Sequence, residues 1–169
     1  MVQLIYHLTK TSEHTYEFTT NTGIKYVIYL TSLSHLSHLF TGEKRVTEKD
    51  FHYLIIDRKD KKIGGKTDIF IKRTVALTLF EFFTQNREAI VVFNYTNLNG
   101  RILAKRRVFK KWFDEYSQDT LYRYYQHDFK DEASICALYR RYSSHLNFVE
   151  VEEQIKNVII KIAEETAKL

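Results

Sequence analysis

The stretch that decides the fold runs from residue 89 to residue 116 and reads AIVVFNYTNLNGRILAKRRVFKKWFDEY. Its first seven residues, AIVVFNY, are almost all apolar, and a run of this length suits a strand that is covered on both faces. A polar turn follows at residues 97–100. Residues 101–117 then predict a helix, because their apolar side chains fall within one stripe: Ile102, Phe109, Trp112, Phe113 and Tyr116. We therefore expect a central strand that leads through a turn into an amphipathic helix.

The residues before this stretch predict a β-hairpin, a third strand and a helix. Apolar and polar residues alternate over residues 16–20 and 26–30, and Asn21-Thr22-Gly23 between them tolerates a positive φ. Residues 51–57 (FHYLIID) are typical of a strand. Residues 68–86 favour a helix with Asp68 as its N-cap. The buried stripe of this helix is expected at Ile69, Val75, Ala76, Leu79, Phe80 and Phe83.

The residues after this stretch predict a second hairpin and a last helix. The hairpin joins residues 121–129 to residues 135–142, which are both rich in Tyr. The helix covers residues 151–168, with Ile155, Val158, Ile159 and Ile162 on its buried face. The order β-β-β-α-β-α-β-β-α predicts an α+β fold. We expect a single domain over residues 1–169, with helices packed on a mainly antiparallel sheet.

Composition limits the class of protein. The chain has 169 residues, 26 Lys and Arg against 21 Asp and Glu, a net charge of +5, no Pro and one Cys. A hydrophobic content of 44% excludes a disordered chain, and no apolar run approaches the length that a membrane span needs. Cys136 has no second cysteine to pair with, and the first ten residues lack the pattern of a secretory signal. We therefore expect a cytoplasmic protein.

The net charge is concentrated in the helix over residues 101–117. The ligand-binding candidates are Gly100 and the six cations that follow it before any acid: Arg101, Lys105, Arg106, Arg107, Lys110 and Lys111. One interpretation is an anion site, in which the free N–H groups after Gly100 act together with Arg101 and Lys105. The other is a solvated helix face, whose cations pair with Asp114, Glu115 or neighbouring elements.

The aromatic content suggests a second function. Twelve Tyr and twelve Phe accompany the cations, and single-stranded nucleic acid stacks on aromatic rings that lie between cations. The segments that this would use are residues 121–125 and 139–142. On a strand, however, Tyr122 and Tyr124 share one face and Arg123 lies on the other, so packing within the sheet explains the same residues.

No catalytic or metal-binding motif is complete. His35 and His38 have the spacing of two metal ligands on a helical turn, but no pattern of further ligands accompanies them. His127 and Asp128 are adjacent, and adjacent residues of a strand point to opposite faces. Cys136 lies in an apolar stretch that is typical of a buried structural thiol. We expect a protein that is not an enzyme and that has no cofactor and no metal.

Residues 89–116 also resemble the signature of an uncharacterised bacterial family, a domain of unknown function. Its pattern is an apolar strand, a turn that ends in Gly-Arg, and a basic helix with an aromatic pair before an acidic residue and Tyr. The matching positions are Gly100, Arg101, Arg107, Phe109, Trp112, Phe113 and Tyr116, and Lys105 stands where the family has Arg. Residues 16–29 resemble the family's opening strands. The resemblance implies a short single-domain protein and names no activity.

The sequence thus predicts a small cytosolic binding or regulatory module without enzymatic activity. Its partner is expected to be a protein or an anionic ligand that contacts the basic helix. The alternative is a nucleic-acid-binding protein that uses the basic helix and the Tyr- and Arg-rich strands. No membrane partner is expected, and the sequence leaves the oligomeric state open.

Overall fold

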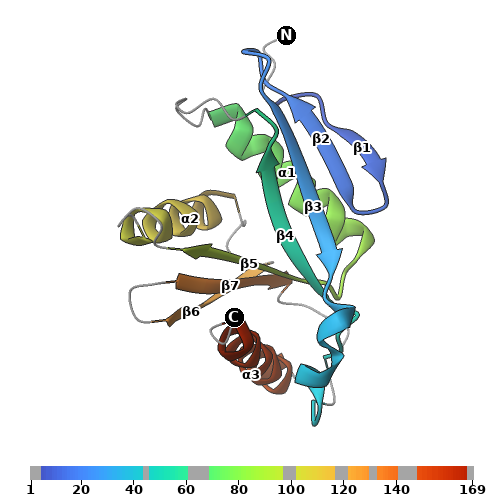
Figure 1. Cartoon of the computed structure of the whole chain (residues 1–169), viewed down its shortest axis with the longest axis vertical. Coiled ribbons are helices and arrows are strands. Elements are labelled where there is room, and N and C mark those ends of the chain that lie inside the picture. The colour runs from blue at the N-terminus through green and yellow to red at the C-terminus, as the bar shows by residue number, and fades with distance from the viewer. Residues whose placement is uncertain are drawn as a thin grey trace. The chain divides into compact units, whose positions relative to one another are not determined.

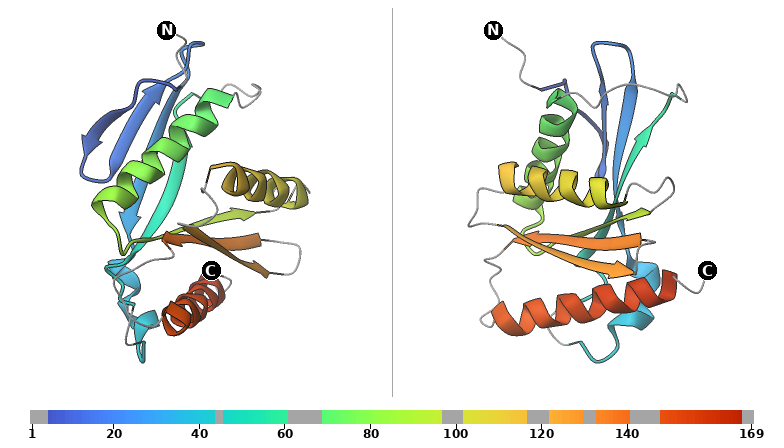
Figure 2. Two further views of the ribbon diagram at one scale, coloured as in Figure 1. Left: turned by 180° about the vertical axis from the view of Figure 1, so that it is seen from behind. Right: turned by 90° about the vertical axis from the view of Figure 1, so that its left-hand side faces the viewer.

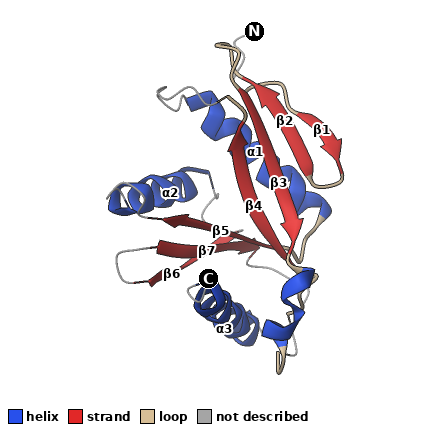
Figure 3. Ribbon diagram, viewed as in Figure 1, coloured by secondary structure: helices blue, strands red, loops and turns tan. Residues whose placement is uncertain are grey.

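The computed structural model describes residues 5–43, 46–60, 69–96, 102–116, 122–129, 133–140 and 148–166. Figure 1 labels the elements, and Figure 3 colours them by type. In chain order they are β1 (Thr9–Ser12), β2 (Thr15–Thr19), β3 (Lys25–Ser32), the 3-10 helix η1 (Ser34–Phe40), β4 (Phe51–Arg58), α1 (Ile69–Gln85), β5 (Ile90–Thr96), α2 (Ile102–Tyr116), β6 (Tyr122–Phe129), β7 (Ala133–Arg140) and α3 (Phe148–Thr166). The predicted α+β class is confirmed.

Seven strands form one sheet in the order β1-β2-β3-β4-β5-β7-β6. The pairs β1–β2, β2–β3, β5–β7 and β6–β7 are antiparallel, and β4 pairs with β5 in parallel. By its internal contacts the chain divides into two compact units, a first unit of Met1–Thr31 with Leu54–Asn86 and a second unit of Ser32–Tyr53 with Arg87–Leu169. The single domain expected from the sequence stays a prediction.

The first unit contains the predicted N-terminal hairpin. β2 and β3 pair without a break from Thr15 opposite Tyr29 to Thr19 opposite Lys25, and Gly23 in the connecting turn has a φ of 80°. Such a φ is costly for residues with a Cβ, which explains the glycine. β1 extends the hairpin by one strand and is not predicted by the pattern, because all four of its residues are exposed. Figure 2 shows α1 running along one face of these strands.

The buried stripe of α1 differs from the predicted one. Ile69 is 46% exposed. The buried positions are Ile71, Thr74, Val75, Thr78, Phe82 and Phe83, while the predicted Ala76, Leu79 and Phe80 are half-buried. Thr74 and Thr78 can enter the core because their hydroxyls donate to the carbonyl oxygens of the preceding turn, at 2.7 and 2.9 Å. A hydrophobic pattern that counts threonine as polar therefore does not predict that these two residues are buried. Asp68, the predicted N-cap, lies outside the described residues.

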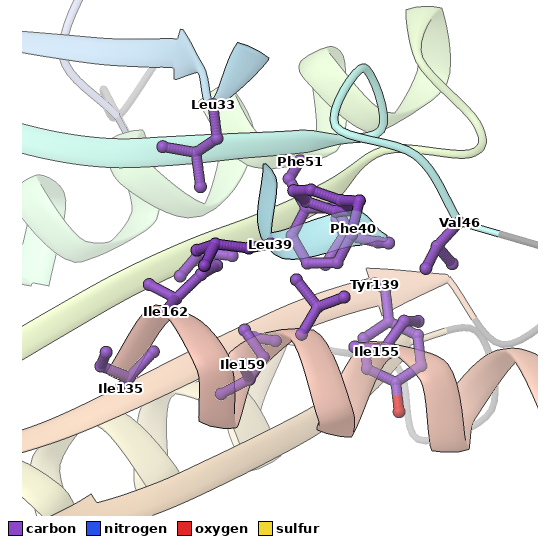
Figure 4. Close-up of a cluster of buried hydrophobic side chains, with 14 of the residues drawn as sticks. Leu33, Leu39, Phe40, Val46, Phe51, Ile135, Tyr139, Ile155, Ile159 and Ile162 are labelled. Atoms are coloured by element: carbon purple, nitrogen blue, oxygen red, sulfur yellow. The ribbon is translucent and has the colours of Figure 1, made fainter. Parts of the chain in front are cut away.

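In the second unit, β5 is covered on both faces, as predicted. Figure 2 shows α2 on one side of β5, β7 and β6, and α3 on the other. Ile90 and Val92 point toward α3 and belong to a buried cluster, part of which is drawn in Figure 4. Phe93 lies on the opposite face, with its ring centroid 5.2 Å from that of Phe109 on α2. The central strand therefore joins two layers of helix.

The cluster on the α3 side also includes η1, which the sequence pattern does not predict. Residues 32–47 have a polar, His-containing sequence, yet Leu39 and Phe40 are buried. The Phe40 ring meets the Phe51 ring edge-on at 4.9 Å. Just after η1, Glu43 forms an ion pair with Lys161 of α3 at 3.3 Å. Leu33 and Val46 of the same segment are buried as well, and Leu36 packs against the cluster, so several apolar residues hold this otherwise polar segment against the core.

The α3 cluster should carry much of the stability of the second unit. Ile159 is fully buried in this cluster, so Ile159→Ala is expected to lower the free energy of unfolding by about 2–5 kcal/mol. Val149 on the same helix is 72% exposed, so Val149→Ala should change it by less than about 0.5 kcal/mol. Urea unfolding followed by circular dichroism measures both. Equal losses in the two variants would contradict the assigned face of α3.

Candidate functional site

The predicted ligand-binding residues fall into three groups, according to whether the structure describes them and how exposed they are. Gly100 and Arg101 lie outside the described residues, and so does the side chain of Lys105. Arg106 is 16% exposed. The other three are exposed: Arg107, Lys110 and Lys111. The anion site proposed for the first turn of this helix rests on Gly100 and Arg101 and stays a prediction.

Arg106 forms an internal ion pair between α2 and the β6–β7 hairpin. Its Nε donates to the Ser134 Oγ at 2.9 Å, and its terminal nitrogen lies 3.2 Å from the Asp128 Oδ1. The Ser134 hydroxyl donates to the same oxygen at 2.6 Å. Asp128 and Ser134 are opposite each other in the register of β6 and β7, which brings the two side chains together on one face. The charge of Arg106 is therefore compensated within the protein.

A chain of hydrogen bonds continues from Asp128 beneath α2. The Gln126 Nε2 donates to the Asp128 Oδ1 at 2.7 Å. The Gln126 Oε1 accepts from the hydroxyls of Tyr95 and Tyr124, both at 2.8 Å. The Tyr124 hydroxyl also lies 3.0 Å from the Cys136 Sγ, and because its proton is given to Gln126, the thiol is the donor. We call these residues the polar network: Tyr95, Arg106, Tyr124, Gln126, Asp128, Ser134 and Cys136.

Burial raises the pKa of the thiol and of the phenols of the polar network, so these groups stay protonated well above neutral pH. Loss of solvation raises the pKa of Cys136 to about 11. It also raises the pKa of Tyr95 to about 12, with a further contribution from the neighbouring Cys136. The pKa of Tyr124 is raised for the same reasons. A protonated, buried thiol is a poor nucleophile, so the arrangement suits holding α2 in place rather than covalent chemistry at Cys136.

The outer face of α2 carries the remaining cations. Lys110 forms an ion pair with Asp114 one turn later, at 3.1 Å. Arg107 and Lys111 are also one turn apart, and neither forms an ion pair or hydrogen bond with any residue in the part of the chain that the structure describes. Leu103 and Val108 beside them are 58% and 44% exposed. We call Leu103, Arg107, Val108 and Lys111 the basic–apolar face.

The tyrosines of the second hairpin serve mainly as packing residues. Tyr122 and Tyr139 are buried, and the Tyr139 hydroxyl donates to Glu152 of α3 at 2.9 Å. Tyr125 lies on the α3 side, where the Lys156 Nζ stands 5.6 Å from its ring centroid. The rings are thus divided between the two faces of the sheet, as the strand pattern predicts. Few of the rings that the structure describes remain for a stacked base, and residues 141–142 of the predicted segment lie outside the described ranges.

Metal ligands do not gather in the described residues. His35 and His38 are exposed, and His38 lies 3.6 Å from Glu165 of α3. Within the described ranges, no group of three or more His, Cys, Asp or Glu side chains is placed to bind a metal ion. The same part of the chain contains no helix with the length and hydropathy that crossing a bilayer requires.

The polar network predicts that Arg106 matters for stability and Arg107 does not. Arg106→Met should lower the free energy of unfolding by about 1–2 kcal/mol, because it removes charge-assisted hydrogen bonds from a mostly buried group. A double-mutant cycle that combines Arg106→Met with Asp128→Asn should give a coupling energy of about 1 kcal/mol. Arg107→Met is the matched control and should stay within about 0.5 kcal/mol of wild type. An equal effect of the two arginine variants in urea unfolding would refute a stabilising role of the Arg106–Asp128 ion pair.

The raised pKa of Cys136 predicts a loss of stability in alkali. Unfolding returns the thiol from a pKa of about 11 to its ordinary 9.0, so between these values the unfolded state binds fewer protons. The free energy of unfolding should therefore fall as pH rises through this range, by up to about 1.4 kcal/mol per pH unit. Cys136→Ser replaces the thiol with a hydroxyl, which can still donate but does not titrate in this range, so its loss of stability between pH 9 and 10 should be smaller. Urea unfolding at each pH measures this, and an identical slope in Cys136→Ser would contradict it.

The chain was also compared with known proteins. Protein-family models, curated proteins and solved structures gave no match to it. The resemblance of residues 89–116 to an uncharacterised bacterial family therefore stays a prediction.

Proposed function

We propose that this chain is a non-enzymatic binding module of the cytosol, which recognises an acidic, partly apolar segment of another protein through the basic–apolar face of α2. The observation that carries the proposal is the pair Arg107 and Lys111. Both are exposed, they stand one turn apart, and they lack an acidic partner within the described residues. Arg106 and Lys110, by contrast, have internal partners.

The spacing of the two cations suggests the form of the partner. Residues one turn apart on a helix are separated by about 6 Å along the axis. Two carboxylates with the same spacing, on a helix or a turn of the partner, would meet Arg107 and Lys111 together. Exposed ion pairs contribute only about 0.2–1 kcal/mol each, so charge alone gives weak binding. The apolar contacts must supply the rest.

Leu103 and Val108 supply that apolar surface. Among the side chains of α2 that the structure describes, they are the exposed large hydrophobic ones, and each is placed beside a cation. When a partner covers such side chains, apolar area is removed from water, and this contributes roughly 25 cal/mol of binding free energy per Å². A phosphate backbone gains little from them, whereas a protein segment with leucines beside its acids gains from both kinds of contact. This favours a protein partner over nucleic acid.

The rigid attachment of α2 supports the same proposal. The Phe109 ring stacks on the Tyr95 ring at 5.4 Å with an angle of 2° between their planes. Arg106 is held by Asp128 and Ser134 on the same side of the helix. A helix fixed in its rotation presents its outer residues to a partner without a further loss of conformational freedom.

The test uses a synthetic helical peptide with two glutamates one turn apart and leucines beside them. Its labelled form should bind the wild-type protein in fluorescence anisotropy. Arg107→Gln/Lys111→Gln should weaken binding about tenfold, because two ion pairs are lost. Leu103→Ser/Val108→Ser should weaken it as well. Lys49→Gln/Arg87→Gln changes the net charge equally at exposed residues elsewhere and should bind like wild type.

Two results would contradict the proposal. The first is equal binding of a peptide in which glutamine replaces glutamate. The second is tighter binding of a mixed single-stranded oligonucleotide, which would favour the nucleic-acid alternative. In that case the Arg107→Gln/Lys111→Gln variant should reduce the slope of log affinity against log salt by about 1.4, since each neutralised phosphate contributes about 0.7.

A further inference from the structure

The first unit contains a half-open cavity of about 450 Å³, away from the polar network and from α2 in sequence. It is bounded by the segment that leads into β1, by β1 and β2, and by α1. The residues that line it are Ile5, Tyr6, His7, Leu8, Lys10, Tyr16, Leu77 and Glu81. This volume lies in the range of pockets that bind small molecules.

The cavity has one positive and one negative side chain that do not neutralise each other. The Lys10 Nζ donates to the Gln85 Oε1 at 3.0 Å and lies 5.6 Å from the centroid of the Tyr16 ring. Glu81 forms no ion pair or hydrogen bond with any residue that the structure describes. A lysine and a glutamate that line one cavity without pairing leave both charges for a molecule that enters it.

Tyr16 brings a buried polar group to the wall of the cavity. Its side chain is fully buried, and its hydroxyl has no hydrogen-bond partner among the described residues. Buried hydroxyls are nearly always paired, and an unpaired one calls for an explanation. Burial and the nearby Glu81 carboxylate raise the pKa of Tyr16, which keeps the phenol protonated and able to donate.

Apart from the polar side chain of His7, the rest of the lining is mainly apolar. Ile5 and Leu8 are half-buried, and Leu77 on α1 is 40% exposed. Tyr6 is fixed from behind, because its backbone N–H donates to the Thr74 Oγ1 at 2.9 Å and its ring stacks on that of Phe18. A ligand for this cavity therefore needs an apolar body as well as two opposite charges.

We propose that the cavity binds a small apolar zwitterion, the chemistry of a free hydrophobic amino acid or of a short apolar peptide. The ligand's ammonium group lies at Glu81 and its carboxylate at Lys10. Its side chain covers Leu8 and Leu77. Neither charge alone is sufficient, since an anion would be repelled by Glu81 and a cation by Lys10. This inference is independent of the function proposed for α2.

The test is isothermal titration of the wild-type protein with leucine and with leucyl-leucine, up to about 10 mM, an order of magnitude above a millimolar Kd. Whichever of these two zwitterions binds more tightly shows whether the natural ligand is an amino acid or a peptide. Leucine amide lacks the carboxylate, and 4-methylpentanoate lacks the ammonium group. Each should bind about fivefold to tenfold more weakly than leucine. The absence of binding by both zwitterions, or equal binding of leucine and its two analogues, would overturn the proposal.

Variants assign the two charges. Lys10→Met should bind leucine and leucine amide equally well. Glu81→Gln should bind leucine and 4-methylpentanoate equally well. The matched controls are Lys49→Met and Glu13→Gln, which make the same changes at exposed residues outside the cavity lining. Circular dichroism establishes that each variant is folded. Wild-type preferences in both folded cavity variants would place the ligand elsewhere and overturn the assignment.

Discussion

The second unit depends on the burial of β5 on both of its faces. A strand with Val91 and Val92 both withdrawn from water needs a cover on each side, and the two covers differ in chemistry. Toward α3, Val92 meets a cluster made almost wholly of aliphatic and aromatic carbon. Toward α2, Phe93 and Tyr95 meet Phe109, and hydrogen-bonded groups lie alongside them. One side of the sheet therefore contributes mainly apolar burial, and the other adds directional contacts.

Directional contacts determine how α2 is rotated. Apolar packing tolerates a helix that turns by a fraction of a residue, whereas a guanidinium held by a carboxylate and a hydroxyl does not. Arg106 is bound in this way by Asp128 and Ser134. Because successive residues of a helix are 100° apart, fixing Arg106 inward places Arg107 outward. The internal ion pair thus determines which cations are presented to solvent.

Much of this arrangement could be predicted from local pattern, and the rest depends on pairing between distant residues. The central strand, both hairpins and three long helices follow from period and turn residues, which act over a few positions. The Asp128 contacts need the register of β6 on β7 and the placement of α2 over both, and neither is local. The burial of Thr74 on α1 cannot be predicted unless the hydrogen bond of its hydroxyl is already known. The cavity joins Lys10 to Glu81, which lie in different segments without a shared motif.

The basic helix illustrates why a charge count does not identify a binding surface. Six cations raise the net charge of the chain, but Arg106 and Lys110 each have a carboxylate within reach. The acid for Lys110 is one turn along the same helix and is visible in the sequence, whereas the acid for Arg106 comes from β6 and is not. Arg107 and Lys111 form no ion pair with any residue in the part of the chain that the structure describes. The charge that α2 can offer a partner is therefore decided by the tertiary fold, through the side of the helix that the β6–β7 hairpin binds.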